Sequence, residues 1–376
     1  MRLVGKYNNY ENSNHTKMRN QFFLTLFLFV IMTSDAFSQD KMLIEPKPAT
    51  IFIELGNNKQ IINFDFLVSH KSKDTLSLDK LSVSVFDNDN NLLQSRFLDN
   101  NGTAPSIMML PKRVWNGEIA QLIFNPFSEF EITTPIKKLE YEWTFSNSAR
   151  KEFVFKSTIY PQKYTQKTKL QFPVKGRILV YDAHDHNSHH RRFDYNFEPI
   201  KAFGINTNFM RYAYDFVILN NDNKQFQNKG ATDQDYFSFG SQIYAIADGK
   251  VIYVASQHKD NKEFDVMKLK ENPLELYGNC VAIQHNDNSV SIYGHLKENS
   301  VKVKVNDMVK GNQPIAQIGV SGSSFFPHLH FEVRTSITNN AEGLPSYFEN
   351  IFLLEGKLKK KSKTGLVETG NIVEAK

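Results

Sequence analysis

The sequence predicts an all-β protein. Short runs of alternating, β-branched and aromatic residues recur at intervals of about 8–12 residues, and clusters of Asn, Asp, Ser and Gly separate them. Stretches with a helical period are scarce along the whole chain. With 376 residues the chain exceeds the usual single domain, so we expect two hydrophobic cores.

Residues 1–38 have the features of a secretory signal peptide. Basic side chains precede an apolar run at 22–32, which is too short to span a bilayer comfortably. Small residues at Ala36 and Ser38 predict cleavage before Gln39, and the alternative is an uncleaved amino-terminal anchor. We therefore expect a secreted or periplasmic protein that has no transmembrane anchor after cleavage.

The charge balance and the cysteine count argue against a nucleic-acid-binding protein and against a protein stabilised by disulfides. The chain carries 45 Lys and Arg against 40 Asp and Glu, and without residues 1–38 the balance is 41 against 38. This predicts no dedicated nucleic-acid surface. The single cysteine, Cys280, has no intramolecular partner for a disulfide, so we interpret it as a small buried residue of a strand.

Residues 39–160 are expected to form an accessory β-sandwich. Four clear strand-like runs lie at 50–55, 61–68, 81–86 and 120–124, with turn-forming residues between them. No residue pattern here indicates catalysis, so spacing, docking or shielding of a partner domain is the expected role. A linker without periodicity follows at 161–172.

The second domain is expected over residues 173–355. Strand-like runs continue through it, and Asp248-Gly249 between two of them is typical of a β-hairpin. Beyond it, residues 356–376 turn polar and basic, and we expect a flexible tail that loosely favours anionic material.

Three histidines of this domain fall into strand-like runs. Because side chains alternate between the faces of a strand, His328 and His330 point to the same side, and so do Tyr293 and His295. Imidazoles on neighbouring strands suit zinc binding or acid–base chemistry. The alternative is that each histidine is a structural residue with its hydrogen bonds satisfied.

The order of these motifs is similar to that of a known family. The segments 278–285, 293–296, 311–319, 321–323 and 328–333 resemble the lysostaphin-like (LytM-type) zinc metalloendopeptidases, which cut the peptide cross-bridges and stem peptides of peptidoglycan. The resemblance implies an antiparallel β-sheet peptidase domain and an exported metalloendopeptidase that hydrolyses peptidoglycan peptides.

The same resemblance implies the zinc site, with one departure. Asp215 and His330 match two of the three zinc ligands, and His295 and His328 match the two residues that assist catalysis. Arg211 stands where the family has its first ligand histidine, four residues before the aspartate. A guanidinium has no free lone pair at physiological pH, so Arg211 is not a ligand.

Three interpretations of Arg211 stay open. In the first, another side chain completes the zinc site: His189 or His190, from a run of four histidines that otherwise is a solvated polar loop, or with less support His285. In the second, the domain binds peptidoglycan, or activates a partner cell-wall hydrolase, without zinc. In the third, Arg211 pairs with Asp215 in a purely structural domain. The peptide bond that would be cleaved depends on loops such as 259–273.

Overall fold

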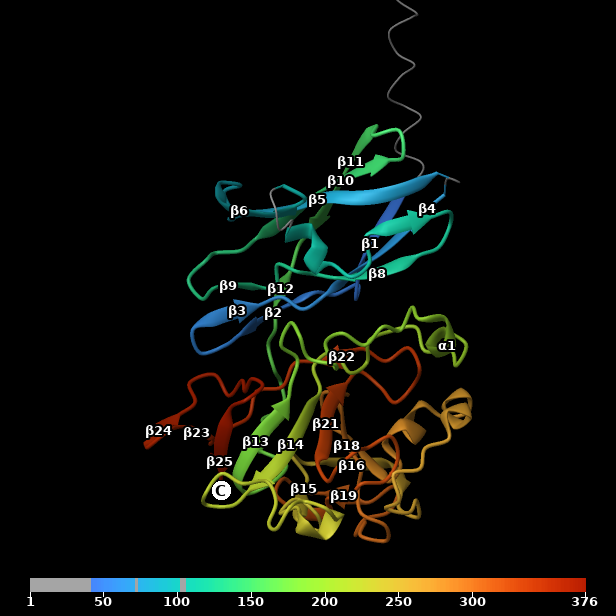
Figure 1. Cartoon of the computed structure of the whole chain (residues 1–376). Coiled ribbons are helices and arrows are strands. Elements are labelled where there is room, and N and C mark those ends of the chain that lie inside the picture. Colours follow the sequence, from blue (N-terminus) through green and yellow to red (C-terminus); the bar gives the residue numbers. More distant parts are fainter. Residues whose placement is uncertain (1–41, 72–73, 102–105) are drawn as a thin grey trace, which may run out of the picture.

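The computed structural model describes residues 42–71, 74–101 and 106–376. They form two β-rich units, one above the other in Figure 1, and the few helices are short, as the all-β prediction requires. The predicted signal peptide and its cleavage site lie outside the described residues. Within the described ranges, no helix is long and apolar enough to cross a membrane.

The amino-terminal unit consists of three sheets around one core. Thr75–Phe86 (β5) and Lys138–Asn147 (β10) pair antiparallel, and their side chains alternate between buried and partly exposed. The buried side chains of β10 include Tyr141, Trp143 and Phe145, which join the core of this unit. The other elements are Met42–Lys47 (β1), Phe52–Leu55 (β2), Lys59–Ile61 (β3), Asp65–His70 (β4), Leu92–Asp99 (β6), Ser106–Met109 (η1), Val114–Asn116 (β7), Gln121–Phe124 (β8), Glu129–Glu131 (β9), Glu152–Ile159 (β11) and Gln162–Lys163 (β12).

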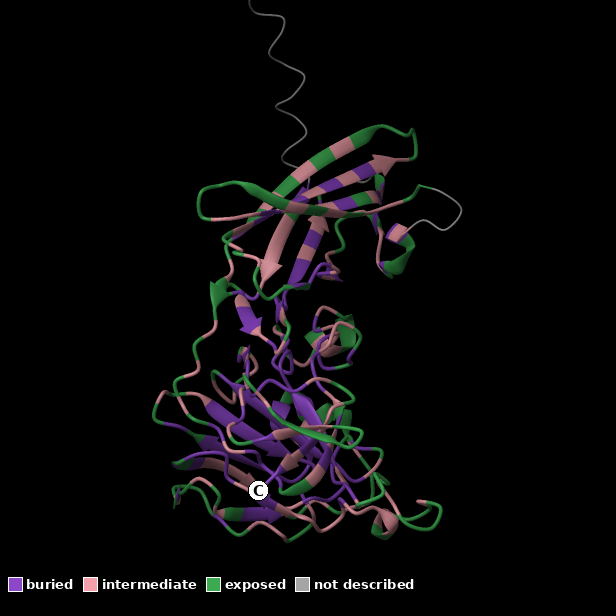
Figure 2. Cartoon of the chain, turned by 90° about the vertical axis from the view of Figure 1, so that its left-hand side faces the viewer, coloured by how far each residue is buried: buried purple, intermediate pink, exposed green. Residues whose placement is uncertain are grey.

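The carboxy-terminal unit is organised by an 11-stranded sheet. Its central strands are Val290–Gly294 (β18), Leu329–Arg334 (β21) and Tyr214–Leu219 (β14), which pair antiparallel and are almost wholly buried, and buried residues dominate this region in Figure 2. The other strands of the sheet are Gly176–Asp182 (β13), Gly249–Ala255 (β16), Cys280–Gln284 (β17), Met308–Val309 (β19), Gly343–Leu344 (β22), Phe352–Glu355 (β23), Leu358–Lys361 (β24) and Ile372–Ala375 (β25). Gln242–Tyr244 (β15) and Pro314–Gln317 (β20) form a separate two-stranded sheet. The helices are Glu198–Lys201 (α1), Asp233–Asp235 (η2), Val266–Lys270 (η3) and Pro273–Tyr277 (η4). Cys280 is buried in β17, as predicted.

The hairpin predicted at Asp248-Gly249 is wrong. β15 pairs with β20, whereas β16 pairs with β17 and β19, so the two runs on either side of this dipeptide do not pair with each other. The Asp248 carboxylate instead accepts hydrogen bonds from Gly311 N and Lys310 Nζ. Gly249 is needed for a close approach, because a Cβ there would lie 2.6 Å from Gln284 O.

The end of the chain also differs from the expected flexible tail. β25 pairs with β13 and with β23, and Val373 is fully buried in the core. Three of the basic residues of the segment, Lys359 to Lys361, lie on β24, which is exposed along its length and pairs with β23. The apolar residues near the terminus therefore hold residues 372–375 in the sheet, which the basic composition of the segment concealed.

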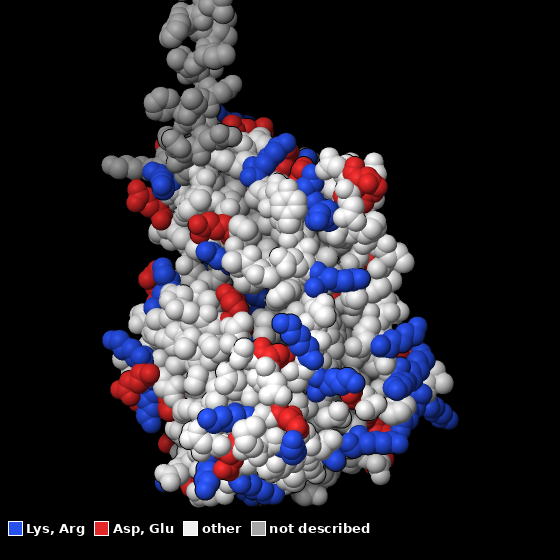
Figure 3. Space-filling model, turned by 180° about the vertical axis from the view of Figure 1, so that it is seen from behind, with Lys and Arg blue, Asp and Glu red and all other residues white. Residues whose placement is uncertain are grey.

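The predicted linker, 161–172, is shared between the units. β12 pairs in parallel with β2 of the amino-terminal unit, whereas Leu170 and Phe172 are buried in the core of the other unit. Leu122 of β8 packs in one buried cluster with residues of the carboxy-terminal unit such as Tyr195. The surface in Figure 3 shows basic and acidic side chains interspersed over both units. The domain boundary at 161–172 stays a prediction.

Candidate metal centre

The register of three neighbouring strands brings the central residues of the site together. In β21, Leu329 and Phe331 belong to the hydrophobic core, so His330 between them points to the opposite face. His330 lies opposite Asp215 of β14 on one side and Gly294 of β18 on the other. His295 follows the last residue of β18, where the backbone turns with φ = +55°, and its ring centroid lies 5.9 Å from that of His330. Tyr293 belongs to the core on the opposite face, so the prediction that Tyr293 and His295 share a face is wrong.

The carboxylate of Asp215 is the centre of this group. Its Oδ1 lies 3.1 Å from His330 Nδ1, 3.4 Å from His190 Nε2 and 3.5 Å from His328 Nε2. Burial raises the pKa of Asp215, but the charged imidazole of His190 outweighs this and holds it well below the usual range. The carboxylate is therefore ionised and available as a ligand.

His190 reaches the centre from the loop that follows β13. That strand ends at Asp182, which lies opposite Asp215 in the sheet, so the loop begins beside the site. The His190 ring is fully buried, and its Nδ1–H donates to the carbonyl of Ala183 at 3.1 Å, with Asp182 Oδ2 at 3.0 Å. This leaves the Nε2 of His190 directed at Asp215 without a hydrogen-bond partner among the described residues.

The electrostatic state of His190 follows from these contacts. Burial lowers its pKa, but the carboxylates of Asp215 and Asp182 more than offset this and raise it to about 10. A metal ion at Nε2 competes with this proton, because only the neutral imidazole is a ligand. One donor atom each from His190, Asp215 and His330 lies within 4.8 Å of the others, which is a grouping that can hold a metal ion.

His189 has a different environment from its neighbour. Its side chain is 65% exposed, its Nδ1 lies 2.8 Å from Asp182 Oδ2, and its Nε2 is 3.9 Å from Asp215 Oδ2. Asp182, His189 and His190 form a second group with donor atoms within 4.8 Å, at the rim of the first. Of the two candidates for the third ligand, His190 lies inside the buried group and His189 at its edge.

His295 and His328 flank the group with one ring nitrogen fixed. The Nδ1–H of His295 donates to Ser321 O at 2.8 Å, and the Nδ1–H of His328 donates to Phe326 O at 2.8 Å, since a carbonyl oxygen only accepts. The ring centroids are 4.9 Å apart. Burial lowers the pKa of both residues, His295 most strongly. Both are therefore neutral, with Nε2 as an acceptor. His295 also has φ = +55°, a strained value for a residue that is not glycine.

Other predicted residues lie outside the group. Arg211 pairs with Asp65 of the amino-terminal unit, Nη1 to Oδ2 at 2.7 Å, and not with Asp215, so the interpretation as an Arg211–Asp215 salt bridge is wrong. His285 hydrogen bonds to Asp248 O and Ser291 Oγ in its own part of the sheet.

Three residues near the group were not predicted from the sequence. Asp182 holds both histidines of the loop, Glu332 Oε1 lies 3.4 Å from His330 Nε2, and the ring of Tyr277 stacks on His330 at 4.6 Å. For Glu332 a signal was present, because it stands two residues after His330 and so shares its face of the strand. Asp182 and Tyr277 reach the site through tertiary packing, which sequence spacing does not reveal.

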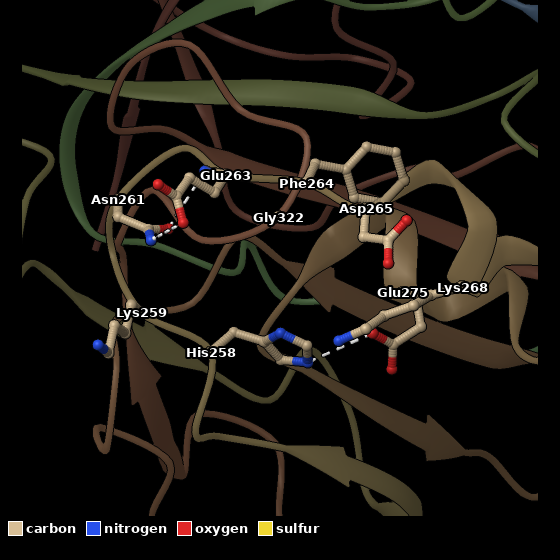
Figure 4. Close-up of a pocket in the computed structure, with 9 residues that line it drawn as sticks. All are labelled: His258, Lys259, Asn261, Glu263, Phe264, Asp265, Lys268, Glu275 and Gly322. Atoms are coloured by element: carbon tan, nitrogen blue, oxygen red, sulfur yellow. Dashed lines mark hydrogen bonds and ion pairs between the residues drawn. The ribbon is translucent and has the colours of Figure 1, made fainter.

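A pocket of about 380 Å³ adjoins this site (Figure 4). Several residues of the 259–273 loop, which was expected to determine specificity, line this pocket. Gly322 also lines it and follows Ser321, whose carbonyl oxygen accepts the hydrogen bond from His295. Side chains of both charges surround it, and His258 Nε2 lies 3.5 Å from Glu275 Oε2. The lining residues are His258, Lys259, Asn261, Glu263, Phe264, Asp265, Lys268, Glu275 and Gly322.

Part of the carboxy-terminal unit matches a known family. Residues 234–342 match the model of peptidase family M23. The chain is 35% identical over 97 residues to lipoprotein NlpD of Yersinia enterocolitica, a match that covers 26% of this chain and 80% of that protein. The chain belongs to peptidase family M23. It is also 34% identical over 119 residues to murein hydrolase activator NlpD of Salmonella dublin, which is 30% of this chain and 26% of that protein.

A solved structure similar to this M23 chain is the catalytic domain of lysostaphin from Staphylococcus simulans, at 26% identity and a TM-score of 0.24, covering 37% of this chain and 79% of that one. The chain spans about a quarter of the length of NlpD from Salmonella dublin. That relative is named a murein hydrolase activator. The M23 match includes His295, His328 and His330, whereas His190 and Asp215 lie before it.

Proposed function

We propose that this M23 chain is a zinc-dependent endopeptidase that cleaves peptides of peptidoglycan outside the cytoplasm, with His190, Asp215 and His330 as the metal ligands. The observation that carries the proposal is the buried Nε2 of His190, which has no hydrogen-bond partner among the described residues and faces the Asp215 carboxylate. Two imidazoles and one carboxylate are a usual ligand set of catalytic zinc, with the fourth position left for water or substrate.

The residues around the donors fit this ligand set. The Ala183 carbonyl fixes His190 with its Nε2 toward the site, and Glu332 contacts the Nε2 of His330, which leaves the Nδ1 of that ring for the metal. Hydrogen bonds of this kind fix the orientation of ligating histidines and raise their basicity. When bound, zinc would polarise the peptide carbonyl and lower the pKa of the attacking water.

His295 and His328 supply the acid–base groups of the proposed reaction. Both are neutral and keep Nε2 as an acceptor, so either ring can take a proton from the attacking water and return it to the leaving amine. The imidazolium formed in this way also stabilises the negative charge that develops on the carbonyl oxygen.

The deciding experiment combines metal analysis with turnover. The purified mature protein should contain about one zinc ion per chain by mass spectrometry, and it should release peptides from purified peptidoglycan. Treatment with a strong chelator should abolish the release, and added zinc should restore it. Metal-free protein that releases no peptides under any of these conditions would refute the enzyme.

A second function is favoured by the similarity to murein hydrolase activator NlpD. In it, the M23 domain binds peptidoglycan or a partner cell-wall hydrolase and catalyses nothing itself. Wild-type protein and a His295→Ala variant would then stimulate a separate hydrolase equally, and both would sediment with cell walls. If the variant loses all effect on cell walls, the activity is catalytic.

A further inference from the structure

We infer that the amino-terminal unit completes the metal site of the carboxy-terminal unit, by holding the loop that carries His190. The inference rests on the proposed metal site and adds to it a positioning role for Asp65 and Asn63, which lie in the other unit. Metal affinity would then depend on the docking of the two units.

The contact is made by Arg191, the residue after His190. Its side chain is fully buried, and its guanidinium donates to Asn63 Oδ1 at 2.8 Å, to Phe64 O at 2.9 Å and to Asp65 Oδ1 at 2.6 Å. All three acceptors belong to consecutive residues of the amino-terminal unit. The fork of an arginine makes such a set rigid, because its donors lie in one plane.

A buried network extends this contact on both sides. The second oxygen of Asp65 pairs with Arg211, so a single carboxylate joins the residue next to His190 to the segment that leads into Asp215. Asn63 Nδ2 donates to Glu54, a second buried carboxylate, at 3.2 Å. Two guanidiniums buried around one carboxylate require that carboxylate to stay in place, since an unpaired buried charge is strongly unfavourable.

The other ligands do not share this dependence. Asp215 and His330 are held by neighbouring strands of the large sheet, whereas His190 lies in a loop without strand or helix. Within the carboxy-terminal unit the loop backbone is tied by Asn208 Nδ2, which donates to the carbonyls of His190 and Arg191. If the amino-terminal unit moves away, His190 loses the adjacent contacts and the site keeps two firmly placed ligands.

Linkage requires the converse. If docking raises metal affinity, metal binding must strengthen docking by the same factor. Zinc should therefore slow hydrogen exchange of the backbone amides around residues 63–65, although these residues do not contact the metal.

The test measures metal affinity in the full-length mature chain. Asn63→Ala and Asp65→Asn should weaken zinc binding by about 10–100-fold, the range typical when residues that orient a ligand are removed. Competition with a chromophoric chelator gives the dissociation constants. In cobalt(II)-substituted protein, both variants should also show a weaker visible absorption band as the tetrahedral donor set is lost.

Tyr347→Phe is the matched control. Tyr347 Oη accepts a hydrogen bond from Leu55 N across the same interface at 2.9 Å, in a contact that does not involve the His190 loop. Its zinc affinity and cobalt spectrum should equal those of the wild type. Asn63→Ala removes a neutral side chain, so it keeps the test valid if Asp65→Asn, with two unpaired guanidiniums, does not fold.

The outcomes separate the inference from the proposed function. Wild-type protein that binds neither zinc nor cobalt refutes the metal site and the inference with it. Wild-type protein that binds zinc, together with a folded Asn63→Ala variant of equal affinity and unchanged cobalt spectrum, overturns the inference alone. Weaker binding in Asn63→Ala, with normal binding in Tyr347→Phe, supports it.

Discussion

Replacement of His190 by alanine tests the metal site most directly, and the adjacent histidine is its control. Both His189 and His190 contact Asp182, so either replacement removes one partner of the same carboxylate. They differ in that the His190 ring is buried with Nε2 3.4 Å from Asp215, whereas the His189 side chain is 65% exposed. We expect His190→Ala to lose zinc and His189→Ala to retain it.

The magnitude follows from the number of ligands. Structural zinc sites with four ligands bind the metal with about 10–16 kcal/mol, which is about 3 kcal/mol per ligand. At about 1.4 kcal/mol for each factor of ten, loss of His190 should raise the dissociation constant about a hundredfold. An exposed ion pair contributes only about 0–1 kcal/mol, so His189→Ala should change the zinc dissociation constant by less than about fivefold.

The assay is titration of metal-free protein with zinc in competition with a chelator of known affinity, at fixed pH, because the metal displaces a proton from His190. Near-ultraviolet circular dichroism confirms that each variant is folded. The reasoning is refuted if His190→Ala binds zinc as the wild type does. A loss confined to His189→Ala would place the ligand at the rim, in the group with Asp182.

Three further outcomes are expected. His295→Ala should keep its zinc while peptide release from peptidoglycan falls by about a hundredfold or more, the usual contribution of a general base; an unchanged rate would exclude His295 from the chemistry. Burial raises the pKa of Glu342 from 4.5 to about 7 in the folded protein. Between pH 4.5 and about 7, Glu342 is therefore ionised in the unfolded chain but still protonated in the folded one, so the free energy of unfolding falls as pH rises through this window. Glu342→Gln should therefore flatten the denaturant-unfolding profile in that window and raise stability above pH 7 by up to about 3 kcal/mol, and a profile like that of the wild type would contradict this. Trp115→Ala should destabilise the protein by about 3–5 kcal/mol, because the ring is fully buried against Phe145; a change below about 1 kcal/mol in urea unfolding would show that this core is loose.

Much of the site could be predicted because it lies on strands. The period of two in 328–333 determines that His328 and His330 share a face, and pairing of β21 with β14 then brings Asp215 beside them. This part of the prediction needs only local pattern and the order of motifs along the chain. His295 lies just beyond the end of β18, and the turn of the backbone there places its ring near His330.

The rest depends on contacts far apart in sequence. His189 and His190 are equivalent as sequence, and only the path of the loop after β13 directs one inward and the other to solvent. The prediction of a hairpin at Asp248-Gly249 was wrong because it also depended on a distant contact. The strand before this dipeptide, β15, pairs with β20, about 70 residues further along the chain. Local turn chemistry cannot select between such partners.

A buried arginine at position 211, in place of a ligand histidine, requires an anion to balance its charge and another imidazole to complete the metal site. In the proposed site His190 replaces the missing imidazole from a different segment, and Arg211 turns to Asp65. The carboxy-terminal unit has a carboxyl of its own near Arg211, Glu342, but burial raises its pKa to about 7, so near neutral pH it carries only part of a negative charge. Asp65 balances Arg211 directly and holds His190 through Arg191. The new cation and the recruited ligand therefore depend on one anion, and the amino-terminal unit provides it.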